Sequence, residues 1–91
     1  MLTLPAEITY ACAAKCLPAL VAAVQKETGA VVRVDATPLQ RFDSSALSVL
    51  LALRRVCVRA GKRFIAENLA PHLQELAALY GVSALLLDPA P

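Results

Sequence analysis

Short runs of apolar and β-branched residues alternate along this chain with longer segments that have helical periodicity. The run AVVRVDA at residues 30–36 is β-branched and typical of a buried strand, and KRFIAEN at residues 62–68 is expected to be a further strand with Phe64 and Ile65 at its centre. The segment between them places leucines at helical spacing over residues 44–60. Strands that alternate with helices favour parallel pairing through right-handed crossovers. With 91 residues, the chain is expected to form a single α/β domain over residues 1–91.

The expected order of elements is β-α-β-α-β-α-β, a four-stranded, mostly parallel sheet flanked by about three helices. The run at residues 2–8 contains Pro5, and because proline cannot donate to a ladder this run is expected at an edge. The run VSALLLD at residues 82–88 is expected to be the last strand. Because Pro18 is tolerated best in a first turn, the first helix is expected to begin at about Leu17. The helices are expected at residues 17–28, 44–60 and 71–80, ended by Gly29, Gly61 and Gly81, with Pro89 and Pro91 closing the chain.

The chain is unusually apolar, with 58% hydrophobic residues against roughly 45–50% in typical soluble domains. Only 4% of the residues are aromatic, so the expected core is aliphatic. The excess suggests that some apolar surface is left for a partner. No apolar run approaches the roughly 18–20 residues of a membrane span, and the first residues, MLTLPAEIT, lack the pattern of a signal peptide. A cytoplasmic protein is therefore expected.

The residues that could carry enzymatic chemistry are few. His72 is the only histidine, and its position just after a helix start predicts a solvated surface side chain. The pairs Asp35/Asp43 and Glu67/Glu75 have no spacing typical of an acid–base couple. The sequence has neither GxxxxGK[ST] nor GxGxxG. We therefore expect a protein that is not an enzyme and that holds no cofactor.

The three cysteines are predicted to be small apolar side chains. An odd number of cysteines fits a reducing compartment. Cys12 and Cys16 are four residues apart and could share a helix face, while Cys57 lies in the middle helix. Two cysteines without nearby histidines are a weak zinc signal, so no metal site is expected.

A basic cluster lies at the end of the middle helix. Its residues complement the negative end of the helix dipole, and they could also form a docking surface for an acidic partner. The net charge of +2 is too small to indicate a nucleic-acid partner, and no aromatic residues are interleaved for base stacking. The cluster consists of Arg54, Arg55, Arg59, Lys62 and Arg63.

The stretch RFDSSALSVLLALRR at residues 41–55 combines a helix start with an unusual outer face. Asp43 is predicted to cap the helix, because its oxygens can accept the unpaired N–H groups of the first turn. At 100° per residue, one side carries the core positions Leu47, Leu50, Leu53, Val56 and Cys57, and the other carries a polar stripe of Ser44, Ser48, Arg55, Arg59 and Lys62, interrupted by Leu51 and Ala52. A polar stripe with an apolar window is typical of a contact surface. A phosphate on Ser44 would add nearly two negative charges beside that window.

These residues resemble the STAS domain family of anti-sigma factor antagonists and their relatives. The resemblance covers nearly the whole chain and rests on LTLPAEIT, VVRVDAT and FDSSAL. The family signature is Asp, Ser or Thr, a small residue, Gly and Leu, which residues 43–47 match except that Ala46 replaces the glycine. By this resemblance, Ser44 is the phosphorylated or partner-contacting position. The resemblance also implies that the family's first strand is missing or very short.

Within the family, the ending LAALYGVSALLL and the proline at position 18 resemble the MlaB-type STAS subunit of Mla phospholipid-transport ABC systems, which serve outer-membrane lipid asymmetry. This resemblance implies a non-enzymatic cytoplasmic subunit that binds and supports the transporter's ATPase and reaches the membrane only through that complex. A helix face at residues 73–80 could join the contact. The implied contact residues are Asp43, Ser44, Ser45, Ser48, Leu51 and Arg55.

Two other functions stay open from the sequence. One is a phosphorylation-regulated anti-sigma factor antagonist, whose partner would be a kinase-like anti-sigma factor. The other is a small-ligand or nucleotide-binding sensor of the same family, which no residue specifically supports.

Overall fold

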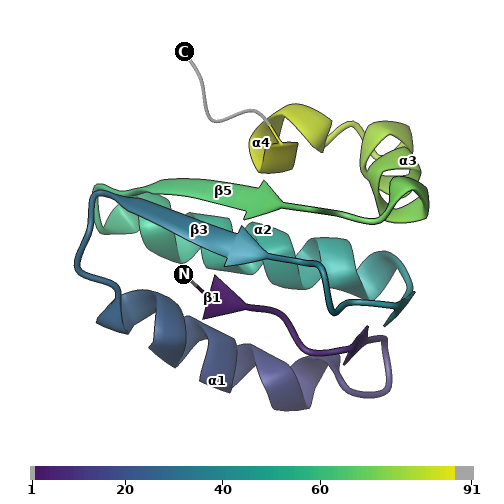
Figure 1. The fold of residues 1–91 in the computed structure, drawn as a ribbon, viewed down its shortest axis with the longest axis horizontal. Helices are drawn as coiled ribbons and strands as arrows, with labels where there is room; N and C mark the ends of the chain where they lie inside the picture. Colours follow the sequence, from purple (N-terminus) through teal and green to yellow (C-terminus); the bar gives the residue numbers. More distant parts are fainter. Residues whose placement is uncertain (1, 88–91) are drawn as a thin grey trace.

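The computed structural model describes residues 2–87, and parallel strands form its centre (Figure 1). Strands β1 (Leu2–Thr3), β3 (Val31–Asp35) and β5 (Arg63–Glu67) form a three-stranded parallel sheet in the order β1-β3-β5. A separate two-stranded parallel sheet joins β2 (Glu7–Ile8) to β4 (Arg41–Phe42). The predicted parallel pairing is therefore confirmed, but the described strands divide into two sheets.

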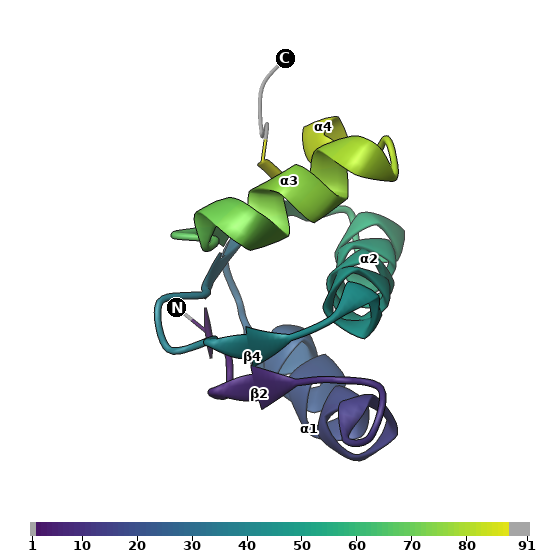
Figure 2. The same cartoon turned by 90° about the vertical axis from the view of Figure 1, so that its right-hand side faces the viewer.

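Four helices surround these strands. They are α1 (Ala13–Lys26), α2 (Ser44–Arg59), α3 (Pro71–Leu79) and α4 (Ser83–Leu87). In Figure 1, α2 lies behind the three-stranded sheet, and α3 and α4 lie beyond β5. Figure 2 shows α1 and α3–α4 at opposite ends of this arrangement, with α2 between them. None of the helices in residues 2–87 is both long enough and apolar enough to cross a membrane.

The core lies between the sheet and α2, and its buried side chains within the described residues are all apolar. Val32 and Val34 of β3 and Phe64 and Ala66 of β5 are buried, as the period of two along a strand requires. The predicted inner face of α2 is confirmed: four of its five core positions are buried and Val56 is half-buried. Because the core takes up the inner face of α2, the outer face of this helix is available to form a site.

The N-terminal region differs from the prediction. Two strands of two residues each replace one strand over residues 2–8, because the chain bends at Ala6 and pairs first with β3 and then with β4. α1 begins four residues before Leu17, so Pro18 lies inside the helix. Pro18 cannot donate a hydrogen bond to the Ala14 carbonyl and its ring crowds that carbonyl, while Leu20 and Val24, later in α1, are buried and stabilise the helix.

Glycine ends two of the three helices for which it was expected. Gly61 and Gly81 both have φ of +73°, the left-handed conformation that closes α2 and α3 as predicted. The prediction for Gly29 was wrong, because α1 already ends at Lys26 and Glu27 is extended. The Lys62 Nζ donates to the Glu27 carbonyl, which ties the end of α1 to the turn after α2.

The predicted last strand was wrong as well. The run SALLL forms α4, which packs against β5 and α2 and buries Leu86 while Leu85 stays exposed. A short apolar run has no distinguishing periodicity, and alanine and leucine are strong helix formers. The predicted four-stranded sheet with about three helices is thus corrected to a three-stranded sheet, a two-stranded sheet and four helices within residues 2–87. Asp88, Pro89 and Pro91 lie outside the described residues.

Candidate functional site

The site is built around the start of α2, where Asp43 makes two hydrogen bonds to different parts of the chain. Its Oδ1 accepts the Ser45 backbone N–H at 2.8 Å, which caps the helix as predicted. Its Oδ2 accepts the Tyr10 backbone N–H at 2.9 Å, which fixes the loop before α1. These two bonds, that of Tyr10 foremost, hold the pKa of Asp43 below its ordinary value of 3.8. The carboxylate therefore serves as a structural anchor for Ser44.

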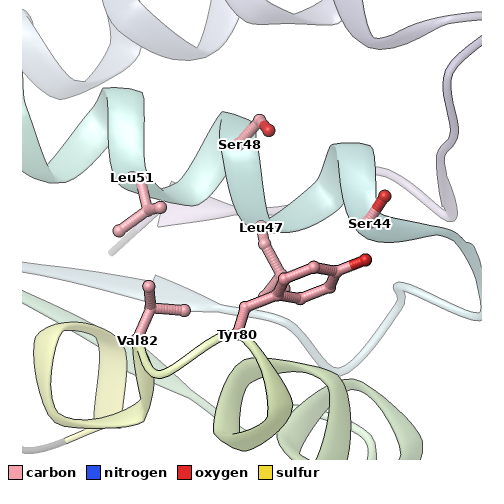
Figure 3. A pocket seen from close by; sticks show the side chains of 6 residues that line it. All are labelled: Ser44, Leu47, Ser48, Leu51, Tyr80 and Val82. Atoms are coloured by element: carbon pink, nitrogen blue, oxygen red, sulfur yellow. The ribbon is translucent and has the colours of Figure 1, made fainter.

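Three of the six expected contact residues line one groove. Ser44 and Ser48 are exposed on α2 and Leu51 is half-buried one turn further on. Together with Leu47, Tyr80 and Val82 they surround a hollow of about 250 Å³ between α2 and the turn that joins α3 to α4. Figure 3 shows the Tyr80 ring lying along α2 with its hydroxyl toward the Ser44 end, and Leu51 facing Val82. We call these six residues the α2 groove.

The other three expected contact residues lie around this groove. Asp43 and Ser45 are half-buried and occupied in the helix cap. Arg55 is exposed one turn beyond Leu51, on the same side of α2. The structure thus places Ser44, Ser48 and Leu51 in the hollow and Arg55 at its far end.

Sequence reasoning gave less weight to the opposite wall of the groove. The helix face expected at residues 73–80 contributes only Tyr80, since Leu73 is fully buried in the core. Val82 was missed because it was assigned to a strand. The sequence feature that could have indicated Tyr80 and Val82 as groove residues is Gly81. Its left-handed backbone turns the chain so that these two neighbours face α2.

Tyr10 is a further residue that the sequence did not indicate. Its side chain is 87% exposed, although its backbone is held by Asp43 at the start of α2. Tyr80, which lines the groove together with Ser44, is 59% exposed. Aromatic side chains are enriched in protein–protein contacts, and Tyr80 places one exposed ring in the groove beside Ser44.

Ala46, at the position where the family signature has glycine, faces the interior. It is fully buried, and its N–H donates to the Asp43 carbonyl at 3.0 Å. The methyl group therefore adds to the core and leaves the exposed face of Ser44 and Ser48 unchanged.

The cysteines and His72 lie in different environments. Cys57 is buried, and burial raises the pKa of its thiol. Burial, and to a lesser degree the nearby Cys12 thiol, raises the pKa of Cys16. Both shifts keep these thiols protonated and weakly nucleophilic. His72 is exposed as predicted, with its ring centroid 5.9 Å from that of Phe42. Within residues 2–87, no three side chains of the metal-binding types are grouped to hold an ion.

A second hollow, which is more open than the α2 groove and has a volume of about 560 Å³, lies at the carboxyl ends of β3 and β5. Asp35 organises its rim: Oδ1 accepts the Thr37 hydroxyl at 2.6 Å, the Asn68 amide at 3.0 Å and the Thr37 backbone N–H at 3.0 Å. The Thr37 hydroxyl and the Asn68 amide lower the pKa of Asp35. The hollow is lined by Ala36, Thr37, Leu39, Gln40, Phe42, Asn68 and Ala70.

Comparison with known proteins identifies the family. No curated protein matches the chain. A protein-family model described as "Mlab, STAS domain" matches residues 1–88, nearly the whole chain. The model spans all the elements that form the α2 groove. The chain therefore belongs to the STAS domain family.

Proposed function

We propose that this protein is a non-enzymatic STAS subunit that binds and supports the ATPase of an Mla-type phospholipid-transport ABC transporter. The observation that carries the proposal is the α2 groove, in which Ser44, Ser48 and Leu51 from α2 meet Tyr80 and Val82 from the α3–α4 turn. STAS domains are generally regulatory or interaction modules, so membership in the family supports a protein-interaction role. The protein would then be cytoplasmic and would lie at the inner membrane only through its complex.

The chemistry of the groove favours a protein partner. Its floor is formed by Leu47, Leu51 and Val82, and the exposed Tyr80 ring forms one wall. Ser44 and Ser48 supply hydroxyl groups at the rim. An apolar floor with a polar rim is typical of a site that receives an apolar side chain of another protein.

The choice of an ABC ATPase as partner rests on the MlaB-like family model and on the ending at residues 76–87. The second candidate is an anti-sigma factor antagonist that binds a kinase-like anti-sigma factor. One observation favours it: Ser44 is exposed at the first position of α2, where a kinase could reach its hydroxyl. Both candidates use the same groove, so they differ in the partner and in whether Ser44 carries a phosphate.

Co-expression with the ATPase from the same organism tests the proposal directly. We expect the two chains to purify together at equal stoichiometry, and a kinase-like anti-sigma factor from that organism to show no binding. Binding of the anti-sigma factor alone, with phosphate transferred to Ser44, would support the second candidate instead.

A matched pair of variants locates the contact. Tyr80→Ala removes an aromatic ring from the α2 groove and should weaken ATPase binding by about tenfold or more, measured by isothermal titration calorimetry. Leu79→Ala is the control, because Leu79 is 79% exposed beside Tyr80 but does not line the groove. Equal affinities for both variants and the wild type would place the contact elsewhere.

A further inference from the structure

Helix α2 carries positive charge on its outer face that the described part of the chain does not neutralise. Its 16 residues include three arginines and neither aspartate nor glutamate. Arg55 and Arg59 are both exposed and are four residues apart, so they are neighbours on one face of the helix. Within residues 2–87, neither of them forms an ion pair. By contrast, Arg33 of β3 is paired with Glu67 at 2.7 Å.

This arrangement of charge has a cost for the chain on its own. Like charges four residues apart on a helix repel each other and destabilise it slightly. The negative end of the helix dipole compensates a charge only within the last turn, which contains Arg59, whereas Arg55 lies one turn earlier. The dipole therefore accounts for one of the two arginines and leaves the repulsion between them in place. Carboxylates supplied by a partner would relieve it.

The two residues, which we call the arginine pair, continue the α2 groove. Figure 3 shows Ser44, Ser48 and Leu51 in order along α2, and Arg55 follows Leu51 by four residues on the same side of the helix. At a rise of about 1.5 Å per residue, Arg55 lies about 6 Å and Arg59 about 12 Å beyond Leu51 along the helix axis. The hollow with its apolar floor and the two guanidinium groups thus follow each other along one side of α2.

We propose that the arginine pair docks a carboxylate-bearing segment of the ATPase, beside the apolar side chain that enters the α2 groove. This inference rests on the proposed function and adds the chemistry of the partner's contact surface. Guanidinium groups bind carboxylates through two parallel hydrogen bonds, and arginine is favoured for such contacts at interfaces. The partner segment therefore carries aspartate or glutamate about 6–12 Å from its apolar anchor, which is a spacing of one to two turns in a helical segment.

Positive charge also attracts anionic lipids, but the surroundings of the arginine pair favour a protein segment. The adjoining hollow has a volume of about 250 Å³ and can receive a side chain. An apolar anchor in a pocket with charged contacts around it is typical of protein–protein interfaces. Recognition of anionic lipids usually takes clusters of about four to eight basic residues, whereas this pair has two and the chain has a net charge of only +2.

Reversal of single charges tests the proposal. Arg55→Glu and Arg59→Glu should each slow association with the ATPase and weaken its affinity by about tenfold in low salt, measured by surface plasmon resonance. In the wild type, association should slow when NaCl rises from about 0.1 M to about 1 M, because the Debye length falls from about 10 Å to about 3 Å. Both variants should lose most of this salt dependence.

Lys15→Glu is the matched control for the change in net charge. Lys15 is exposed on α1, and no residue of α1 lines the α2 groove. This variant changes the net charge by the same amount as either arginine variant, so it should bind the ATPase as the wild type does. A loss of affinity in Lys15→Glu as large as in Arg55→Glu would show that only the total charge matters, which overturns the proposal.

Thermal unfolding separates the contact from the fold. Arg55→Glu places a carboxylate four residues before Arg59, which is the favourable order for an ion pair along a helix. The melting temperature of this variant should therefore equal or exceed that of the wild type while its binding falls. A lower melting temperature would assign Arg55 to the stability of the fold and would overturn its role as a contact residue.

The remaining outcomes distinguish this inference from the proposed function. If the wild type binds the ATPase and both arginine variants bind it equally well, the inference is wrong while the proposed function stands. If the wild type does not bind the ATPase at all, both are wrong. Vesicles of phosphatidylcholine and phosphatidylglycerol in equal parts test the lipid alternative. The wild type should not sediment with them, and sedimentation that is lost in Arg55→Glu would assign the arginine pair to lipid headgroups instead.

Discussion

Asp43 joins the start of α2 to the loop before α1 by accepting the Tyr10 backbone N–H at 2.9 Å across 33 residues of chain. The same carboxylate caps α2 through the Ser45 N–H. One side chain thus holds both the backbone at Tyr10 and the start of the helix that carries Ser44 into the α2 groove. In the family signature this aspartate precedes the serine, and the structure gives a physical reason for that order: the acid holds the backbone while the hydroxyl faces solvent.

The anchor should make stability depend on pH. The hydrogen bonds lower the pKa of Asp43 in the folded state below 3.8, so the ionised carboxylate stabilises the fold. This contribution is fully present above the unfolded pKa and is lost as pH falls below 3.8 through the folded pKa. Asp43→Ala should lower the melting temperature at neutral pH more than Asp43→Asn, whose amide oxygen can still accept one of the two bonds. Equal melting temperatures for both variants and the wild type at neutral pH would contradict this role.

Ser44→Ala should change the free energy of unfolding by no more than about 0.5 kcal/mol, because Ser44 is exposed and the cap is supplied by Asp43. Urea denaturation measures this change. A loss of about 1 kcal/mol or more, the usual cost of removing a cap, would show that Ser44 has a structural role of its own.

Leu51→Asp should abolish binding of the ATPase by placing an unpaired charge in the apolar floor of the α2 groove. Because Leu51 also packs against the core, we expect a stability loss of about 1–2 kcal/mol in a protein that remains folded. Val58→Asp is the control, since Val58 is exposed on the same helix outside the groove. Pull-down of the ATPase compares the variants, and wild-type affinity in Leu51→Asp would refute the assigned surface.

Gly81→Ala should destabilise the protein by about 1 kcal/mol, because a side chain is strained at a φ of +73° even where space is open. Gly29→Ala should be neutral or slightly stabilising, since Gly29 has no positive φ and a Cβ there would meet only ordinary contacts at 3.8 Å. Chemical denaturation of the pair measures both effects. Since Gly81 sets the wall formed by Tyr80 and Val82, its variant should also bind the partner more weakly.

Sequence patterns with a strong physical cause predicted the structure well. The β-branched run at residues 30–36 became β3, the run at residues 62–68 became β5, and helical spacing assigned the inner face of α2 correctly. The Asp43 cap was predictable because few side chains can accept the N–H groups of a first turn. These features depend on local chemistry that the sequence displays directly.

The predictions that failed depended on tertiary contacts. Nothing in the run SALLL distinguishes a strand from a short helix until α2 and β5 are in place to bury Leu86. The extension of α1 before Pro18 also depends on packing, because the lost hydrogen bond must be offset by burial elsewhere in that helix. The opposite wall of the groove was assigned incompletely for the same reason, since its position follows from the turn between α3 and α4.

The presence of a helix at residues 83–87 has a consequence for the behaviour of the chain at high concentration. A strand in its place would have ended the sheet with a row of free N–H and C=O groups, which recruits further strands from other molecules. Instead, α4 packs against β5, the strand at that edge of the sheet (Figure 1). At the opposite edge of the sheet, β1 has only two residues, so it offers few backbone groups to which a strand of another molecule could bind. The chain has an apolar content of 58%, yet residues 2–87 contain no long exposed edge strand that would seed fibrils.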